Sequence, residues 1–180
     1  MKNLDAVATH EIFDMKYACA QEDLPPCEDI CPLHINIRAF MRHVSDGNFD
    51  AAYAEYRKRA LFPEILSRTC SYACGKACVR MAQDEALDIR GIEIATCLFA
   101  EKKQLRRSYI RRQGKTVIII GGGLTGLSSA VMLAQKGYEI HVYEAESELG
   151  GSLCKLDTHI LSEEVRKAEL KDMRSEEQHV

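Results

Sequence analysis

The stretch CEDICPLHINIRAF, residues 27–40, contains two cysteines with three residues between them and has Pro32 directly after the second. Behind this pair, apolar residues from Ile37 to Val44 recur at the spacing of one helix face, and Gly47 ends that pattern. The stretch therefore predicts a cysteine-bearing turn that leads into an amphipathic helix.

A second group of cysteines, CSYACGKAC at residues 70–78, repeats the same gap twice. Grouped thiols at short gaps are the pattern of a metal or redox site, and a loop followed by a helix can bring two such groups together. Two further cysteines, Cys97 and Cys154, are predicted to be buried, inert thiols. The other six are the candidate ligands: Cys19, Cys27, Cys31, Cys70, Cys74 and Cys78.

Composition limits the chemistry open to these thiols. The chain has 180 residues, 46% of them apolar, and a net charge of −3, which implies no general attraction to nucleic acid. Its first twenty residues contain no apolar run of the kind that a secretory signal needs. We therefore expect a cytoplasmic protein in a reducing compartment.

Three chemistries compete for the grouped cysteines. Disulfides are disfavoured by the compartment. Structural zinc is an alternative, although zinc sites mostly use tighter Cys-x2-Cys pairs. Iron–sulfur ligation suits a cysteine followed by proline within a run of short gaps, with a remote group that completes the site.

The rest of the chain up to residue 112 is predicted to be mainly helical, and basic residues gather at 102–115. We expect a solvated helix end there, with a docking surface for an acidic partner or for cofactor phosphates as the alternative. The further expected segments are a helix over residues 51–60 capped by Asp50, a short segment opened by Pro63, and a helix from Ile89 to about Arg112.

After residue 114 the pattern changes to that of a βαβ unit: a strand over residues 116–120, a helix over about 124–136 and a strand over about 139–143. Residues 116–135 carry no charge and are long enough to span a bilayer, but four glycines interrupt them, so a membrane span is disfavoured. Residues 162–174 are weakly helical.

The turn after the first strand has the glycine spacing of a dinucleotide-binding loop, in which glycines allow a tight turn, close approach of a pyrophosphate and helix packing. The helix N-terminus then faces the phosphates. Glu144, 18 residues after the third glycine, stands where a ribose hydroxyl is usually held. The glycines of this loop are Gly121, Gly123 and Gly126, and a second pair, Gly150 and Gly151, follows the acid.

Residues 15–97 resemble the N-terminal iron–sulfur domain of glutamate synthase small-subunit-like flavoproteins and the corresponding domain of dihydropyrimidine dehydrogenase. The likeness rests on the order of the first cysteine, the Cys-Pro pair, the FP dipeptide, the cysteine triplet and the Ile-x-x-x-Glu that ends at Glu93. The resemblance implies a helical, ferredoxin-type module that binds two [4Fe–4S] clusters with interleaved ligands.

Two such clusters need about eight ligands, and the resemblance supplies them residue by residue. It assigns Cys31, Cys70, Cys74 and Glu93 to one cluster. It assigns Cys19, Cys27 and Cys78 to the other, with Glu22 where many relatives have a further cysteine. Glu22, Asp23 or a water would complete this second site; a three-iron cluster and a solvated Glu22 are alternatives.

The glycine pair after the ribose acid resembles the FAD-binding fold of two-dinucleotide-domain flavoproteins, which include the family named above. FAD is expected in preference to NAD, and NADP is disfavoured because a carboxylate would repel its 2′-phosphate. The expected cofactor-binding residues are Gly121, Gly123, Gly126, Glu144, Gly150 and Gly151.

The expected fold is mainly α: a helical two-[4Fe–4S] ferredoxin-type domain over residues 1–112, then an incomplete α/β Rossmann-like segment that binds FAD over residues 113–180. The family continues with the rest of the FAD domain and an NAD(P)H domain, so we expect an N-terminal fragment that is inactive alone. Two strands leave apolar faces uncovered, which predicts weak FAD affinity and either loose packing or self-association through residues 117–120.

For the complete polypeptide, the resemblance implies an oxidoreductase in which NAD(P)H reduces FAD and the clusters pass electrons to or from a partner subunit or domain. No residue of this chain is predicted to be catalytic, and nothing in it specifies the final substrate. Two other classes stay open. One is a zinc-stapled helical adaptor with a non-catalytic nucleotide fold; the other binds nucleic acid through residues 102–115 in a salt-sensitive manner.

Overall fold

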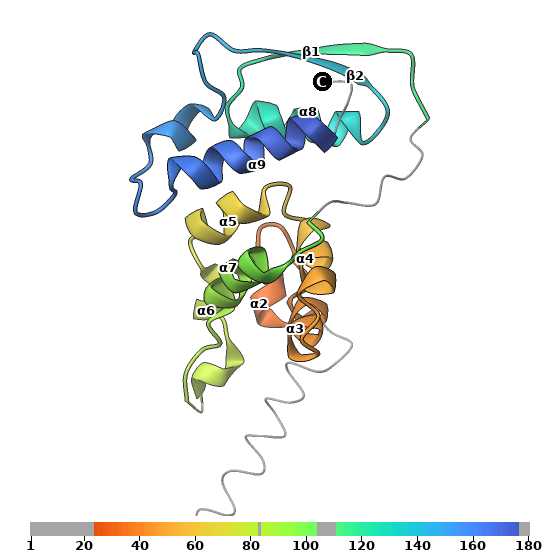
Figure 1. Ribbon diagram of the computed structural model, residues 1–180. Helices are drawn as coiled ribbons and strands as arrows, with labels where there is room; N and C mark the ends of the chain where they lie inside the picture. Colours follow the sequence, from red (N-terminus) through yellow and green to blue (C-terminus); the bar gives the residue numbers. More distant parts are fainter. Residues whose placement is uncertain (1–23, 83, 104–110, 177–180) are drawn as a thin grey trace, which may run out of the picture. The chain divides into compact units, whose positions relative to one another are not determined.

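The structure is a computed structural model, and it describes residues 24–82, 84–103 and 111–176, with side chains up to residue 171. It divides into two compact units (Figure 1). The first comprises residues 1–63 and 70–103, and the second comprises residues 64–69 and 104–180.

The first unit is helical. Helix α3 packs against α4, and α4 packs against α7, so that an aromatic and aliphatic core forms between them. Phe40, Tyr56 and Ile89 are fully buried in this core. The helices in chain order are α2 (Pro26–Asp29), α3 (Ile37–Ser45), α4 (Phe49–Arg57), α6 (Ala73–Lys76), the 3-10 turn η1 (Val79–Ala82) and α7 (Ile89–Phe99).

Helix α4 is capped by Asn48, whose side-chain oxygen accepts a hydrogen bond from the Ala51 amide at 3.0 Å. The prediction that Asp50 caps this helix is therefore wrong. The carboxylate of Asp50 instead accepts hydrogen bonds from the backbone amides of Glu101 and Lys102, at 2.8 and 2.9 Å. Asn48 and Asp50 are both residue types that can cap a helix, but Asp50 is engaged by the amides after α7 and Asn48 caps α4.

The same contact explains where α7 ends. The expected helix from Ile89 to about Arg112 begins as predicted but stops at Phe99, because Ala100 turns into extended conformation with φ −68° and ψ 125°. The next two amides then bond to Asp50 rather than to helix carbonyls. Part of the predicted continuation, residues 104–110, lies outside the described residues.

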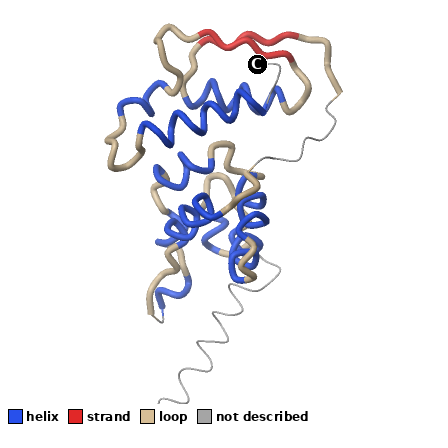
Figure 2. The backbone as a smooth tube through the Cα atoms, in the orientation of Figure 1, coloured by secondary structure: helices blue, strands red, loops and turns tan. Residues whose placement is uncertain are grey.

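The second unit contains the expected βαβ arrangement (Figure 2). Strands β1 (Thr116–Ile120) and β2 (Glu139–Tyr143) pair in parallel, with Thr116 opposite Glu139, and α8 (Leu124–Ala134) connects them and packs on one face of the sheet. The unit also contains α5 (Pro63–Thr69), the 3-10 turn η2 (Gly151–Lys155) and α9 (Glu163–Glu176).

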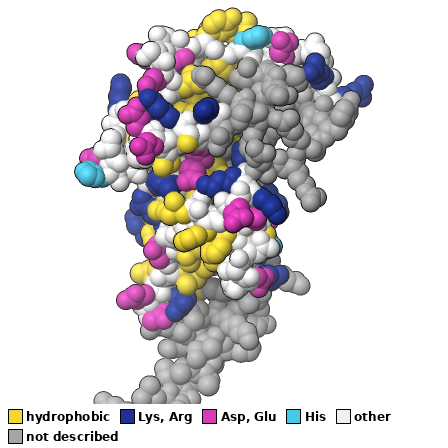
Figure 3. All heavy atoms as spheres, in the orientation of Figure 1, with side chains coloured by type: hydrophobic (Ala, Val, Ile, Leu, Met, Phe, Trp, Pro, Cys, Tyr) yellow, Lys and Arg dark blue, Asp and Glu magenta, His cyan; other side chains and the backbone are white. Residues whose placement is uncertain are grey.

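The two faces of this sheet differ. Ile140 is fully buried on the α8 side, whereas Ile118 and Ile120 on β1 and Tyr143 on β2 are exposed on the other side. Hydrophobic side chains accordingly lie on the surface over the two strands (Figure 3). Parallel strands are usually covered on both faces, and in the described residues only one face of this pair is covered.

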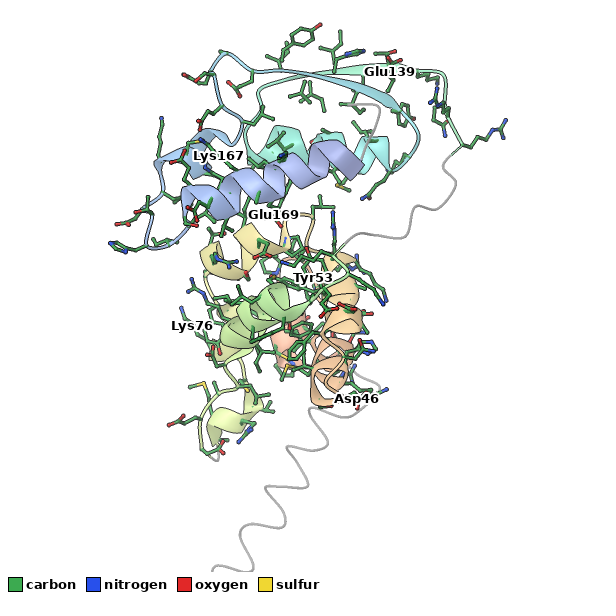
Figure 4. The ribbon with its side chains drawn as sticks, viewed as in Figure 1. Asp46, Tyr53, Lys76, Glu139, Lys167 and Glu169 are labelled. Carbon is green, nitrogen blue, oxygen red and sulfur yellow. The ribbon has the colours of Figure 1, made fainter. Side chains whose placement is uncertain are left out.

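Helix α9 is tied to α5 by a carboxylate. Glu169 accepts hydrogen bonds from the backbone amides of Glu64 and Ile65, both at 2.8 Å, and so caps the start of α5 (Figure 4). Two segments about 100 residues apart in sequence therefore belong to one unit. Within the described residues, no helix combines the length and apolar character needed to cross a bilayer.

Candidate metal centre and nucleotide-binding loop

The two cysteine groups are carried by short helices that pack together. Cys27 lies within α2 and Cys31 follows shortly after its end, while Cys74 lies within α6. Helix α2 contacts α6, and α6 contacts α7, which carries Glu93. Side chains from three segments far apart in sequence therefore meet in one region of the first unit.

The turn between Cys70 and Cys74 is held by Tyr72. This residue adopts the left-handed conformation, with φ 59° and ψ 42°, directly before α6. Its hydroxyl donates a hydrogen bond to the carbonyl of Leu87, and its ring occupies the space that a side chain at Gly75 would need. Because the left-handed region is unfavourable for a bulky residue, these contacts must hold the backbone between the two thiols in place.

Cys74 has three predicted ligands as its electrostatic neighbours. Burial, followed by the charges of Glu93, Cys70 and Cys31, raises the pKa of this thiol to about 12. These are the three groups that the family resemblance assigns to the same cluster as Cys74. Several acids that share a buried region cannot ionise together without a positive group among them, and a metal cluster supplies that charge.

The four predicted ligands around Cys74 are neighbours, but they do not form a compact site for a single metal ion. Among the described residues, no three histidine, cysteine, aspartate or glutamate side chains are gathered closely enough to hold one metal ion. Two buried polar atoms on the same helices, Glu28 Oε2 and Thr96 Oγ1, have no hydrogen-bond partner within the described part of the chain. Such atoms are costly when buried. The chemistry of the donor set, three thiols and a carboxyl as neighbours in one region, fits an iron–sulfur cluster.

Glu93 is the buried carboxylate of α7. Its side chain is largely removed from solvent, and burial raises its pKa to about 7, while a hydrogen bond from Tyr56 and the charge of Arg90 act in the opposite direction. The Tyr56 hydroxyl donates to Glu93 Oε2 at 3.3 Å. The helical spacing of Phe49, Tyr53 and Tyr56 signals that Tyr56 faces inward, but nothing local indicates that its partner lies on α7.

The second predicted cluster is only partly within the described residues. Cys27 and Cys78 are both half-buried. Cys74 and Cys78 are electrostatic neighbours of Tyr72, whose pKa is raised mainly by burial. Cys19 and Glu22 lie outside the described residues. The ligand set of this site therefore stays a prediction.

The two remaining cysteines differ from each other. Cys97 is fully buried in α7, as predicted. The prediction for Cys154 is wrong, because this residue is exposed on η2, with its sulfur 3.5 Å from the Leu149 carbonyl oxygen. The short turn of η2 buries Leu153 instead, and the next residue consequently points outward.

The glycine loop between β1 and α8 brings two backbone segments into contact. Gly126, in the first turn of α8, lies against the carbonyl oxygen of Gly121, so a side chain there would overlap the loop. No side chain caps the start of α8 at Leu124. The amides of that first turn and the helix dipole therefore favour an anion such as a phosphate at this loop.

The second glycine pair is joined to this loop. The Gly150 amide donates to the Gly122 carbonyl at 2.8 Å, and Gly150 forms a parallel bridge with Gly123. A Cβ at Gly151 would stand 3.0 Å from the Gly123 Cα, and Gly150 has a φ of 122°, which favours glycine. The close approach of the two loops thus explains why both positions are glycine.

Glu144 lies at the end of β2 beside the same loop. Its carboxylate accepts hydrogen bonds from the amides of Gly122 at 2.6 Å and Glu146 at 3.0 Å. These backbone hydrogen bonds, that from Glu146 first, hold the pKa of Glu144 below its ordinary value. The structure therefore brings Glu144 and both glycine groups together, while their binding of a nucleotide stays a prediction.

Comparison with known families agrees with both parts. Residues 4–104 match the family described as dihydropyrimidine dehydrogenase domain II, 4Fe-4S cluster. Residues 119–155 match the NAD(P)-binding Rossmann-like domain. The first match covers more than half of the chain, and the second coincides with the glycine loop, β2 and the second glycine pair.

Three curated relatives cover the same region. The NADP(+)-dependent formate dehydrogenase subunit beta of Moorella thermoacetica is 32% identical over 72% of this chain and 22% of its own length. The glutamate synthase [NADPH] small chain of Azospirillum brasilense is 32% identical over 75% and 29%. The NAD-dependent dihydropyrimidine dehydrogenase subunit PreT of Escherichia coli is 27% identical over 80% and 37%.

The chain thus spans between about a fifth and two fifths of the length of these relatives. The resemblance to glutamate synthase small-subunit-like proteins is confirmed by the second of them. By the match over residues 4–104, the chain belongs to the family of iron–sulfur domains typified by domain II of dihydropyrimidine dehydrogenase.

Proposed function

We propose that this chain is the electron-transfer portion of a cytoplasmic, flavin-dependent oxidoreductase. Residues 1–112 form a ferredoxin-type domain with two [4Fe–4S] clusters, and residues 113–180 form the first part of an FAD-binding domain. In the complete polypeptide, electrons pass between NAD(P)H-reduced FAD and the clusters, toward a partner subunit or domain. When bound, FAD exchanges electron pairs as hydride, and a [4Fe–4S] cluster carries single electrons.

The observation that carries the proposal is the surroundings of Cys74. Its electrostatic neighbours are Glu93, Cys70 and Cys31, and the chain belongs to a 4Fe-4S family. We assign these four side chains to one cluster. Three thiolates and a carboxylate give that cluster one hard oxygen ligand, which alters its potential relative to a cluster with four cysteines.

For the second cluster we propose Cys19, Cys27 and Cys78, with Glu22 as the fourth ligand. Cys27 and Cys78 are half-buried, which suits ligands at the edge of a compact domain. A carboxylate at position 22 would replace a cysteine that many relatives have, so this cluster is the one whose composition most needs a direct count of iron.

For the nucleotide we propose FAD, with its pyrophosphate at Gly121, Gly123 and Gly126 and its ribose at Glu144. The joined second pair, Gly150 and Gly151, supports a flavin fold because it keeps side chains away from the loop. The role of Glu144 is to accept a hydrogen bond from the ribose hydroxyl, in exchange for one of its present amide donors.

The partner is proposed from the relatives. Three of them are named as a beta subunit, a small chain and a subunit of larger enzymes, so we infer that this chain also delivers electrons to another subunit.

The test is anaerobic reconstitution with iron and sulfide, followed by iron counting and electron paramagnetic resonance of the reduced protein. About eight irons per chain with two interacting signals are expected, since two four-iron clusters are proposed. About four irons would restrict the proposal to the Cys31, Cys70, Cys74 and Glu93 site. Bound zinc without iron would overturn it and favour a zinc-stapled adaptor.

A further inference from the structure

Tyr56 is a fully buried phenol whose hydroxyl is directed at Glu93. It lies on α4 with no exposed surface, its ring packs against Phe40 with centroids 5.7 Å apart, and α4 packs on α7. The hydroxyl donates to Glu93 Oε2 at 3.3 Å. Because the ring is fixed by packing, the donor has a fixed position relative to α7.

The Tyr56 hydroxyl donates to only one of the two carboxylate oxygens of Glu93, Oε2, and not to Oε1. A carboxylate has two oxygens with about four acceptor sites in total, and the phenol occupies a site on only one of them. A tyrosine phenol has an ordinary pKa of about 10, so it carries its proton at neutral pH. Tyr56 is therefore a permanent donor beside a buried acid.

We propose that Tyr56 is a positioning residue for a metal-ligating Glu93: its hydroxyl holds Oε2, so that Oε1 faces the iron–sulfur cluster, and it tunes the potential of that cluster. This inference rests on the proposed function, in which Glu93 is a ligand. Ligating carboxylates are generally held by such outer hydrogen bonds, which fix their orientation.

The direction of the effect follows from charge. A hydrogen bond to a ligand withdraws electron density from it, and the reduced cluster carries one more negative charge than the oxidised cluster. The donor therefore stabilises the reduced form more and raises the reduction potential. Without the hydroxyl, the potential shifts to a more negative value, and the carboxylate is free to rotate away from the iron.

Tyr53 provides a matched control. It is a second buried tyrosine on α4, one helical turn before Tyr56, and its ring lies under the Lys103 ammonium group, 5.9 Å from the centroid (Figure 4). Tyr53→Phe removes a hydroxyl from the same buried helix, as Tyr56→Phe does, but leaves the Glu93 hydrogen bond in place. A shift in cluster potential that appears in Tyr56→Phe but not in Tyr53→Phe therefore reports on the contact with Glu93.

The experiment is a redox titration of the reconstituted chain, monitored by electron paramagnetic resonance, together with the rate of iron loss to a chelator. For Tyr56→Phe we expect a more negative potential and about 10- to 100-fold weaker cluster retention, with wild-type values for Tyr53→Phe. In Glu93→Gln, ligation of iron through the amide oxygen would turn the amide nitrogen, a donor rather than an acceptor, toward Tyr56. Adding Tyr56→Phe to that variant should therefore shift the potential little.

The outcomes separate the two proposals. If Glu93→Ala leaves the electron paramagnetic resonance signals of both proposed clusters unchanged, ligation by Glu93 is overturned, and the role of Tyr56 with it. If Glu93→Ala loses that spectrum but Tyr56→Phe and Tyr53→Phe behave alike, only the role of Tyr56 is overturned. Should Tyr56→Phe fail to fold by circular dichroism, Glu93→Asp replaces it, because the shorter side chain withdraws the carboxylate from the Tyr56 hydroxyl, and an unchanged potential there contradicts the proposal equally.

Discussion

Gly126 packs with no room to spare against the carbonyl oxygen of Gly121. Since the obstructing atom belongs to the backbone, Gly126→Ala must displace either the glycine loop or the start of α8. We expect the second unit to lose roughly 1–3 kcal/mol of stability, as in other overpacked sites. Hydrogen exchange of the α8 amides measures this loss. Ser129→Ala, exposed on the same helix, is the control, and equal protection in both variants would contradict the contact.

At Glu144 the prediction concerns pH. Its two amide donors bind the charged carboxylate, so its folded pKa lies below its unfolded pKa. The stabilisation is therefore fully present above the ordinary glutamate pKa and is lost as the pH falls through the depressed folded value. The amide resonance of Gly122 should therefore titrate with a midpoint below the ordinary glutamate pKa. A midpoint at or above that value, or the same titration in Glu144→Gln, would be inconsistent with the hydrogen bond.

At this scale, what the sequence predicts depends on whether a residue acts through its neighbours in the chain. The glycine spacing predicts the loop because each glycine serves a turn within a few residues of itself. Tyr56 escapes prediction because its partner lies 37 residues away on another helix. Family resemblance, rather than spacing, groups Cys31, Cys70, Cys74 and Glu93 as ligands of one cluster, since spacing alone leaves zinc and iron–sulfur ligation open.

At the scale of elements, the end of α7 depends on one half-buried carboxylate, that of Asp50. The Asp50 carboxylate accepts hydrogen bonds from the backbone amides of Lys102 and Glu101. These hydrogen bonds, that from Lys102 first, hold the pKa of Asp50 below its ordinary value. In Asp50→Ala, the amides after α7 should exchange with solvent faster while α4 keeps its cap from Asn48. Hydrogen exchange measures both. The control is Asp46→Ala, at an exposed aspartate after α3, which should change neither set of amides. Faster exchange of the α4 amides in Asp50→Ala would instead show that Asp50 caps α4.

Helix and strand positions follow from sequence wherever pattern and boundary signal coincide. Helix α3 begins after a capping Asn36 and stops before Gly47, and both strands match the predicted ranges. The sequence predicts a helix from Ile89 to about Arg112, which is longer than the observed α7, because the basic residues after Phe99 suit a helix as well as a loop. A contact with Asp50, about 50 residues earlier, decides between them, and no window along the chain contains that information.

For the molecule as a whole, the uncovered sheet face dictates behaviour in solution. Ile120 is 89% exposed, Ile118 63% and Tyr143 61%, on adjacent positions of two paired strands. A contiguous apolar surface on a sheet with unpaired edges favours association with another copy. We therefore expect the sedimentation coefficient of the isolated chain to rise with concentration.

Replacing both isoleucines by threonine keeps the β-branched side chains that suit a strand and removes much of the apolar surface. The Ile118→Thr, Ile120→Thr variant should therefore sediment as a monomer at concentrations where the wild-type chain associates. Ile160→Thr, at an exposed isoleucine away from the strands, should behave as wild type. If the wild-type chain has a concentration-independent radius and strongly protected amides over residues 113–180, the two-strand sheet is stable without a cover, and the association argument fails.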